Sequence, residues 1–189
     1  MTASTLLELL GWIRDAGIPV WLDGGWGVDA LVESQSRAHK DVDLIIAQSD
    51  SNRLTKLLNE HAYRFKEGRP ENFVLADDAG REIDVHVVEF DEDGNGVYRM
   101  ENGELWVFPA EGFTGRGRVE GVEVQCLSPE VAVECHANGY TPQEKDFADM
   151  ELLERRFGVV LPPTLRRPNG DEPARAIDQQ HRVNRKPRA

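Results

Sequence analysis

The sequence contains little cysteine, few aromatic residues and no long apolar run. Its two cysteines, Cys126 and Cys135, have no metal-type spacing, which excludes a disulfide-stapled scaffold and favours a reducing compartment. No window approaches the roughly 18 consecutive apolar residues that a membrane-spanning helix needs. Internal repeats are absent as well, so a solenoid is excluded. These absences predict a soluble, cytoplasmic protein without a membrane partner.

Positive charge is also scarce, and it is unevenly distributed. The chain has 22 Lys and Arg against 34 Asp and Glu, a formal net charge of -12. Residues 161–189 hold seven basic and three acidic residues, which leaves residues 1–160 with a net charge of -16. A body of that sign repels phosphate backbones at long range, so nucleic acid is a disfavoured partner.

Composition divides the chain into a body and a tail. The body, residues 1–160, alternates helix-like and strand-like patterns and has the length of one domain. Residues 161–189 are rich in Pro and Arg, lack aromatic residues and show no periodicity. We therefore expect one folded domain followed by a flexible basic tail.

The pattern of the body predicts a mixture of helices and strands. Apolar spacing and capping signals predict helices over residues 4–16, 26–33, 50–60, a helix beginning at Ser128-Pro129, and one over 142–157. Asp50 is expected to cap the helix over residues 50–60. Strands are expected over residues 19–23, 41–47, 62–66, 72–76, 81–90, 97–100, 105–108 and 119–126. The fold class is therefore α+β: a twisted mixed sheet, helices on one face, and a small helical segment over residues 126–158.

Asp41 and Asp43 form a pair of carboxylates on the expected strand over residues 41–47. Residues i and i+2 of a strand point to the same face, so both acids project one way while Val42 and Leu44 enter the core. Two like charges held side by side are costly unless something neutralises them, and Mg²⁺ favours such carboxylates together with phosphate oxygens. An edge strand with solvated acids is the alternative.

Gly24 and Gly25 lie between an apolar strand and a helix. Without side chains they allow the backbone to approach phosphates, although a plain turn gives the same pattern. Arg37, His39 and Lys40 form a compact donor cluster between the glycines and the acid pair. Such cations are suited to a triphosphate, and ordinary solvation of a loop is their alternative role.

A third acidic element lies on the expected strand over residues 81–90. Glu82, Asp84 and His86 share one face of this strand. If the strand neighbours residues 41–47, Asp84 completes a three-carboxylate cluster with Asp41 and Asp43. Such a cluster can hold two metal ions and leave one carboxylate near an attacking hydroxyl as general base.

Together, residues 21–46 (WLDGGWGVDALVESQSRAHKDVDLII) resemble the signature of the lincosamide and aminoglycoside 2''-O-nucleotidyltransferase family. That family lies within the polymerase-β-like nucleotidyltransferase superfamily, and the resemblance extends over residues 4–158. It implies transfer of a nucleoside monophosphate, usually AMP from ATP, to a small-molecule hydroxyl. It also implies that Gly24 and Gly25 bind phosphates, that Asp41 and Asp43 bind two Mg²⁺ ions, and that Asp84 is the third carboxylate. The antibiotic acceptor would be lincosamide-like or aminoglycoside-like.

Four residues of the C-terminal helical segment are candidates for acceptor binding: Tyr140, Glu144, Asp146 and Asp149. The three acids form either an acidic wall for a cationic acceptor or a solvated helix face. Two other functions remain open from the sequence, namely modification of a tRNA or a protein and a non-catalytic nucleotide-binding module. A monomer and a homodimer are equally compatible with it.

Overall fold

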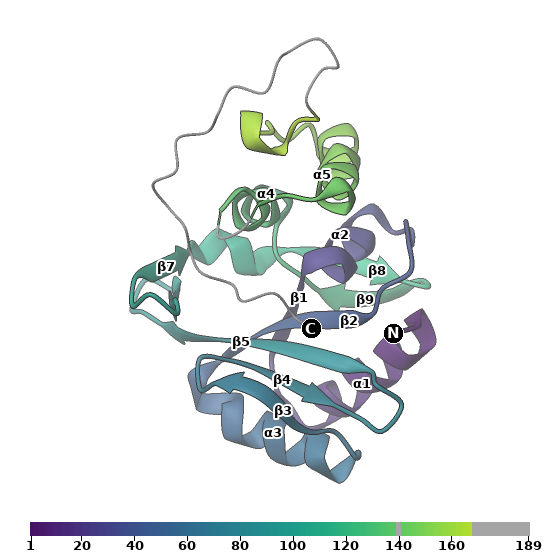
Figure 1. Cartoon of the computed structure of the whole chain (residues 1–189), viewed down its shortest axis with the longest axis vertical. Helices are drawn as coiled ribbons and strands as arrows, with labels where there is room; N and C mark the ends of the chain where they lie inside the picture. Colours follow the sequence, from purple (N-terminus) through teal and green to yellow (C-terminus); the bar gives the residue numbers. More distant parts are fainter. Residues whose placement is uncertain (139–140, 168–189) are drawn as a thin grey trace.

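The computed structural model describes residues 1–138 and 141–167, which form a mixed sheet with helices on two sides (Figure 1). The helices are α1 (Ala3–Asp15), α2 (Gly24–Val32), α3 (Ser51–Glu60), α4 (Pro129–Ala137) and α5 (Glu144–Phe157), with 3-10 turns η1 (Gln48–Asp50), η2 (Ala110–Thr114) and η3 (Pro163–Leu165). The strands are β1 (Val20–Asp23), β2 (Asp41–Ala47), β3 (Arg64–Arg69), β4 (Asn72–Ala76), β5 (Glu82–Phe90), β6 (Gly96–Arg99), β7 (Leu105–Phe108), β8 (Arg116–Val119) and β9 (Val122–Gln125). The α+β class is confirmed.

The main sheet has the order β1-β2-β5-β4-β3, and β6 and β7 continue it from the end of β5. Strands β2 and β5 are parallel, whereas β1 with β2 and β4 with β5 are antiparallel. The sheet is therefore mixed, as the sequence predicts. Its central parallel pair brings the two acidic strand motifs next to each other.

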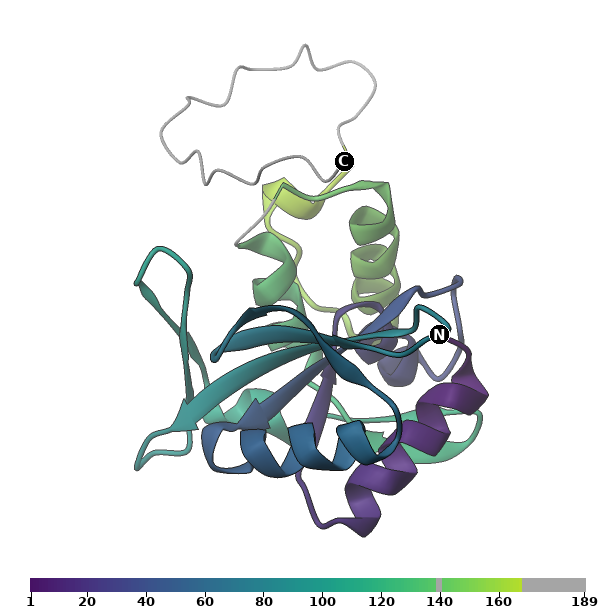
Figure 2. The same ribbon diagram turned by 60° about the horizontal axis from the view of Figure 1, so that its bottom comes forward.

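Helices cover both sides of the sheet, whereas the sequence predicts helices on one face. Helices α1 and α3 lie below it in Figure 1, and α2, α4 and α5 lie above it; Figure 2 shows α1 and α3 from their own side. Val42, Leu44 and Ile46 are fully buried in the main core, while Asp43 is half-buried and Asp41 exposed. The expected alternation of β2 is confirmed, and it leaves the acids on the side of α2 and α5.

Two local expectations are wrong. Residues 119–126 form no single strand: β8 and β9 are a hairpin, turned at Glu120 and Gly121 with positive φ of 47° and 80°. Gly117 lets this hairpin approach α2, because a Cβ there would lie 2.3 Å from the carbonyl oxygen of Ala30. Asp50 precedes α3 without capping it, since its carboxylate accepts a hydrogen bond from Arg53 instead.

The packed body continues past the expected boundary at residue 160. Leu161 and Leu165, on either side of the start of η3, are buried in the main core. The rest of the expected tail, residues 168–189, lies outside the described residues, and so does Tyr140. Within the described ranges, no helix has the length and apolarity to span a bilayer.

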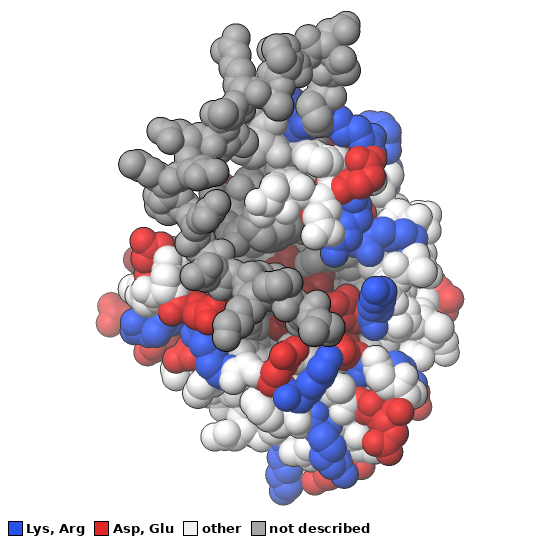
Figure 3. Space-filling model, viewed as in Figure 1, with Lys and Arg blue, Asp and Glu red and all other residues white. Residues whose placement is uncertain are grey.

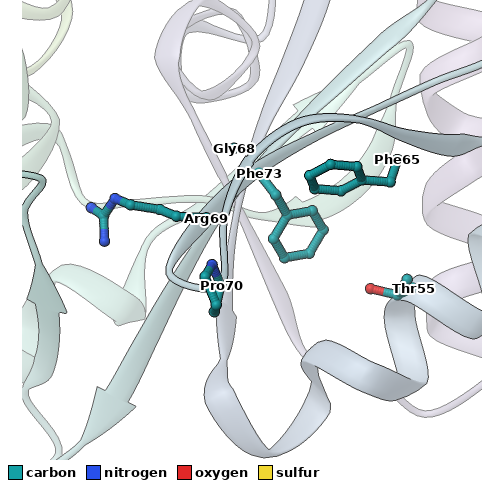
Figure 4. Close-up of a pocket in the computed structure, with 6 residues that line it drawn as sticks. All are labelled: Thr55, Phe65, Gly68, Arg69, Pro70 and Phe73. Atoms are coloured by element: carbon teal, nitrogen blue, oxygen red, sulfur yellow. The ribbon is translucent and has the colours of Figure 1, made fainter.

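A shallow hollow of about 310 Å³ lies between α3 and the β3–β4 hairpin. Phe65 and Phe73 line it together with Thr55, and Arg69 points away from it (Figure 4). Phe73 is paired with Val85, whose side chain enters the main core. The hollow therefore lies on the face of the sheet opposite Asp84, away from the acidic motifs.

Candidate active site

A row of three aspartates crosses the adjacent strands β1, β2 and β5. Asp23 is the register partner of Asp43, and Asp43 is the partner of Asp84. Directly paired residues have side chains on the same face about 5 Å apart, so the three carboxylates are neighbours. Figure 3 shows acidic atoms gathered at the centre of this face, between the sheet and the C-terminal helices, with basic atoms beside them.

The middle carboxylate of this row, Asp43, is surrounded by other negative charges. Burial raises the pKa of Asp43 well above its ordinary value, and the negative charges of Asp23, Asp41 and Asp84 raise it further. The ammonium of Lys145 acts in the opposite direction. A site with this excess of negative charge favours a proton or a cation at Asp43.

Three side chains of this face have the arrangement of a metal site. A carboxylate oxygen of Asp43, one of Asp84 and a ring nitrogen of His86 all lie within 4.8 Å of one another. Carboxylate oxygens with one imidazole fit a divalent cation. Asn72 Nδ2 donates a 2.7 Å hydrogen bond to Asp84 Oδ1 and thereby fixes its orientation. Asp41 lies at the exposed start of β2, where its register partner is Glu82, and joins the site through its charge.

Gly24 begins α2 directly after the acidic row. Its φ is +57°, and a Cβ atom there would lie 2.1 Å from Asp43 Oδ2. Only glycine therefore fits both the left-handed backbone and the space occupied by the carboxylate. The side chain of Asp23, at the N-cap, forms no capping hydrogen bond, so the N–H groups at the start of α2 remain available to an anion beside Asp43.

We expect Gly24→Ala to destabilise the protein by about 1–2 kcal/mol from the left-handed backbone alone, and to displace Asp43. Its melting temperature and its activity should both fall. Gly11→Ala is the matched control, because Gly11 lies within α1 and no atom would lie within 4 Å of its added Cβ. This control should stabilise the fold slightly. A Gly24→Ala protein as stable and active as wild type would contradict the packing described for Gly24.

Arg37 and His39 belong to a network that joins α2, the segment before β2, and α5. Arg37 donates to both carboxylate oxygens of Asp149, through Nη2 at 2.8 Å and Nε at 3.4 Å, and its Nη1 lies 3.0 Å from His39 Nδ1. His39 Nε2 is 2.5 Å from Asp29 Oδ2, and Asp29 Oδ1 accepts from the backbone and hydroxyl of Ser36. Asp29, His39 and Asp149 are buried. Their contacts hold residues 36–39, which precede β2, against α2 and α5.

The same network occupies the space beside Gly25. A Cβ atom on Gly25 would lie 2.3 Å from Arg37 Nη2 and 2.6 Å from His39 Cε1. Lys40, the third member of the expected donor cluster, has an exposed side chain that forms no hydrogen bond or ion pair with the described residues. It lines a polar hollow of about 560 Å³ with Asp41, Arg81 and Glu82. Of the three donors, Lys40 is thus the one available to a ligand.

The acids of α5 already have partners. Asp149 pairs with Arg37, and Asp146 accepts a 2.7 Å hydrogen bond from the backbone N–H of Gln143 in a capping box. Both are buried, whereas Glu144 is exposed and forms an ion pair with Arg167. These contacts do not fit an acidic wall that is free to bind an acceptor, and the burial of Asp146 and Asp149 does not fit a solvated helix face either. The fourth candidate, Tyr140, is outside the described residues.

Four residues at this site had no role assigned from the sequence: Asp23, Asn72, His86 and Lys145. Asp23 could have been found, because it ends an apolar strand directly before the glycine pair. Asn72 and Lys145 are recognisable only through the chain fold, which places β4 beside β5 and α5 against α2.

Comparison with known proteins agrees with this geometry. The model of the aminoglycoside-2''-adenylyltransferase family matches residues 5–153. A lincosamide resistance protein of Staphylococcus haemolyticus is 26% identical over 155 residues, which cover 82% of this chain and 95% of that protein.

Solved structures give the same result. The lincomycin-bound lincosamide antibiotic adenylyltransferase LnuA has a TM-score of 0.72 and 26% identity, covering 82% of this chain and 97% of its own. ANT(2'')-Ia in complex with adenylyl-2''-tobramycin has a TM-score of 0.64 and 19% identity, covering 81% and 87%, and shows the fold alone. The expected polymerase-β-like nucleotidyltransferase fold is confirmed, and the two alternative functions are not favoured.

Proposed function

Because the chain belongs to the aminoglycoside-2''-adenylyltransferase family, we propose that it transfers AMP from ATP to a hydroxyl group of a lincosamide-like antibiotic. The observation that carries this proposal is the row of carboxylates across β1, β2 and β5, which begins next to the free N-terminus of α2. A row of anions beside available backbone N–H groups suits a metal-bound triphosphate.

The chemistry requires few groups. The donor set of Asp43, Asp84 and His86, with the charge of Asp41 beside it, fits divalent cations. When bound, Mg²⁺ ions would neutralise the triphosphate and polarise its phosphorus–oxygen bonds. Asp43 would hold a cation together with Asp84 and His86, and Asp41 would add its negative charge beside them. The N–H groups of α2 orient the phosphates, and Lys40 contributes a positive charge at the rim.

One further residue, Asp84, has a role in the transfer step. Asp84 accepts the proton of the acceptor hydroxyl, whose oxygen forms a bond to the α-phosphorus. The bond from that phosphorus to the bridging oxygen breaks, and pyrophosphate leaves with the electron pair. Asn72 keeps the carboxylate of Asp84 aligned through its 2.7 Å hydrogen bond. The rest of the catalytic effect is positioning and charge neutralisation.

The charges near the site support a lincosamide rather than an aminoglycoside. An acceptor with several amines needs several free carboxylates, but Asp146 and Asp149 are buried and already bonded, and Glu144 pairs with Arg167. A lincosamide carries one basic amine and requires fewer. The lincosamide-resistance relative from Staphylococcus haemolyticus supports the same choice.

The proposal is tested by pyrophosphate release from each of the four NTPs with lincomycin or tobramycin as acceptor. We expect turnover with ATP and lincomycin in Mg²⁺, no turnover in EDTA, and recovery when Mg²⁺ is added in excess. Mass spectrometry of the product should show one added adenylyl group. Asp43→Asn protein serves as the inactive control. Turnover that persists in EDTA would contradict the metal assignment. A failure of both lincomycin and tobramycin to cause pyrophosphate release would contradict the acceptor assignment.

A further inference from the structure

Strand β5 places an imidazole beside the carboxylates of the acidic row. His86 follows Asp84 by two residues, so both side chains lie on the face of the sheet that carries Asp43. One ring nitrogen of His86 and one carboxylate oxygen from each of the two aspartates lie within 4.8 Å of one another. This donor set therefore contains a nitrogen atom, unlike the three-carboxylate set of Asp41, Asp43 and Asp84 expected from the sequence.

The distance between His86 and Asp84 suits a shared cation better than a direct bond. Nε2 of His86 lies 3.8 Å from Oδ1 of Asp84, which is too long for a hydrogen bond. Two atoms that each lie about 2.1 Å from one metal ion are up to about 4.2 Å apart, so an ion fits between them. Within residues 1–138 and 141–167, Nε2 of His86 forms no hydrogen bond.

The other ring nitrogen of His86 can carry the proton of the neutral imidazole. It is Nδ1, and its only neighbour at hydrogen-bond distance among the described side chains is Asn72 Nδ2, at the long distance of 3.5 Å. That amide already donates to Asp84 Oδ1 at 2.7 Å and to the carbonyl oxygen of Val85 at 3.3 Å. The lone pair of Nε2 is then available to a metal ion.

An aromatic neighbour on β6 holds the ring of His86. Tyr98 meets it edge to face, with ring centroids 5.9 Å apart and an interplanar angle of 67°. Arg69 fixes Tyr98 in turn, since its Nη2 donates a 3.1 Å hydrogen bond to the phenol oxygen and its Nη1 pairs with Glu71. The imidazole therefore has a defined orientation, which is the usual contribution of groups that lie behind a metal ligand.

We propose that His86 makes this cation site selective for a transition-metal ion of the Mn²⁺ class over Mg²⁺. The proposal rests on the proposed function, because it takes the site to be the one that holds the cation of the triphosphate. Mg²⁺ is a hard ion that binds oxygen ligands, whereas first-row transition metals also bind imidazole nitrogen. A nitrogen in place of one oxygen therefore favours the transition metal, and Tyr98 is the positioning residue for that nitrogen.

A spectroscopic measurement without nucleotide or antibiotic tests the ligand directly. With substoichiometric Mn²⁺ at pH 8, electron spin echo envelope modulation should show coupling of the ion to an imidazole nitrogen in the wild type and none in His86→Gln. His61→Gln, at the end of α3 on the other side of the sheet, is the matched control and should keep the coupling. A wild-type spectrum without this coupling, or a coupling that persists in His86→Gln, would overturn the proposal.

Titrations measure the selectivity. The Kd of Mn²⁺, followed by the paramagnetic resonance of the free ion, should be at least about tenfold lower than the Kd of Mg²⁺ obtained by competition. His86→Gln should raise the Kd of Mn²⁺ about tenfold and change that of Mg²⁺ much less, because glutamine offers an amide oxygen. Tyr98→Leu should also weaken Mn²⁺ binding, whereas Tyr98→Phe, which keeps the ring, should largely restore it. Equal affinities of the wild type for the two ions, or equal losses in His86→Gln, would overturn the proposal.

This proposal and the proposed function fail separately. Circular dichroism in EDTA first shows that each variant is folded. A protein that binds Mn²⁺ through His86 but transfers AMP to neither lincomycin nor tobramycin would overturn the acceptor assignment and support the role of His86. Adenylyl transfer by a protein that binds Mn²⁺ and Mg²⁺ equally well would support the proposed function and overturn the selectivity.

Discussion

Replacing Asp43 by asparagine is expected to lower adenylyl transfer about 10³-fold while the fold is retained. Asp43 is the middle carboxylate of the row, between Asp23 and Asp84, and it contributes an oxygen to the only group of metal-ligating side chains found among the described residues. The measurement is kcat/KM for both substrates, accompanied by circular dichroism to show that the fold is intact. Asp78→Asn, on an exposed turn, is the matched control and should keep full activity.

The same substitution should stabilise the metal-free protein, and the effect should depend on pH. Burial and three like charges raise the pKa of Asp43 in the folded protein, so between the ordinary and the raised pKa the folded state binds more protons than the unfolded state. The stability of wild type therefore falls as pH rises from the ordinary value near 4 through the raised pKa. Asparagine carries no charge, so its stabilising effect should grow over this window and disappear below pH 4.

Melting temperatures of the two proteins at pH 4 and pH 8, both in EDTA, measure this difference. Added Mg²⁺ should raise the melting temperature of wild type at pH 8 and have little effect on Asp43→Asn, because binding to the folded state stabilises it. A substitution that lowers the melting temperature at pH 8, or an equal response to Mg²⁺ in both proteins, would contradict the assignment of Asp43.

The sequence predicts those parts of the site that depend on strand periodicity. The period of two places Asp41 with Asp43 and Asp84 with His86, and the parallel register of β2 and β5 then brings Asp43 beside Asp84. Local rules are sufficient here, because each motif is short and lies within a single strand. The strands of the main sheet follow from the same patterns and lie close to their expected places, whereas β8 and β9 do not.

Contacts between distant segments could not be predicted in this way. Arg37 and Asp149 are separated by 112 residues, and no local pattern identifies either one as the partner of the other. The role of Gly25 was also hidden, because the atoms that would meet its Cβ belong to Arg37 and His39. The division of residues 116–125 into a hairpin depends on Glu120, a non-glycine residue with positive φ, which favours no turn by its own propensity.

These distant contacts change the interpretation of the charged residues. From composition, acids on α5 and cations before β2 are two separate groups, one for the acceptor and one for the nucleotide. In the folded protein, Asp149 on α5 and Arg37 in the segment before β2 neutralise each other. In the proposed function, the positive charge available to a nucleotide comes from Lys40 and the N-terminus of α2.

Asp84→Asn separates the two roles that the geometry allows for Asp84. As the general base, Asp84 acts in the transition state, so Asp84→Asn should lower kcat about 10²–10⁴-fold and change the Kd of α,β-methylene-ATP much less. Asn72→Ala should give a smaller fall in kcat with an unchanged Kd, because it removes only the 2.7 Å hydrogen bond that orients Asp84. Single-turnover kinetics and analogue titration on both variants measure the two quantities. If Asp84→Asn loses affinity for the analogue as strongly as it loses kcat, Asp84 is chiefly a metal ligand, and another group must accept the proton of the acceptor.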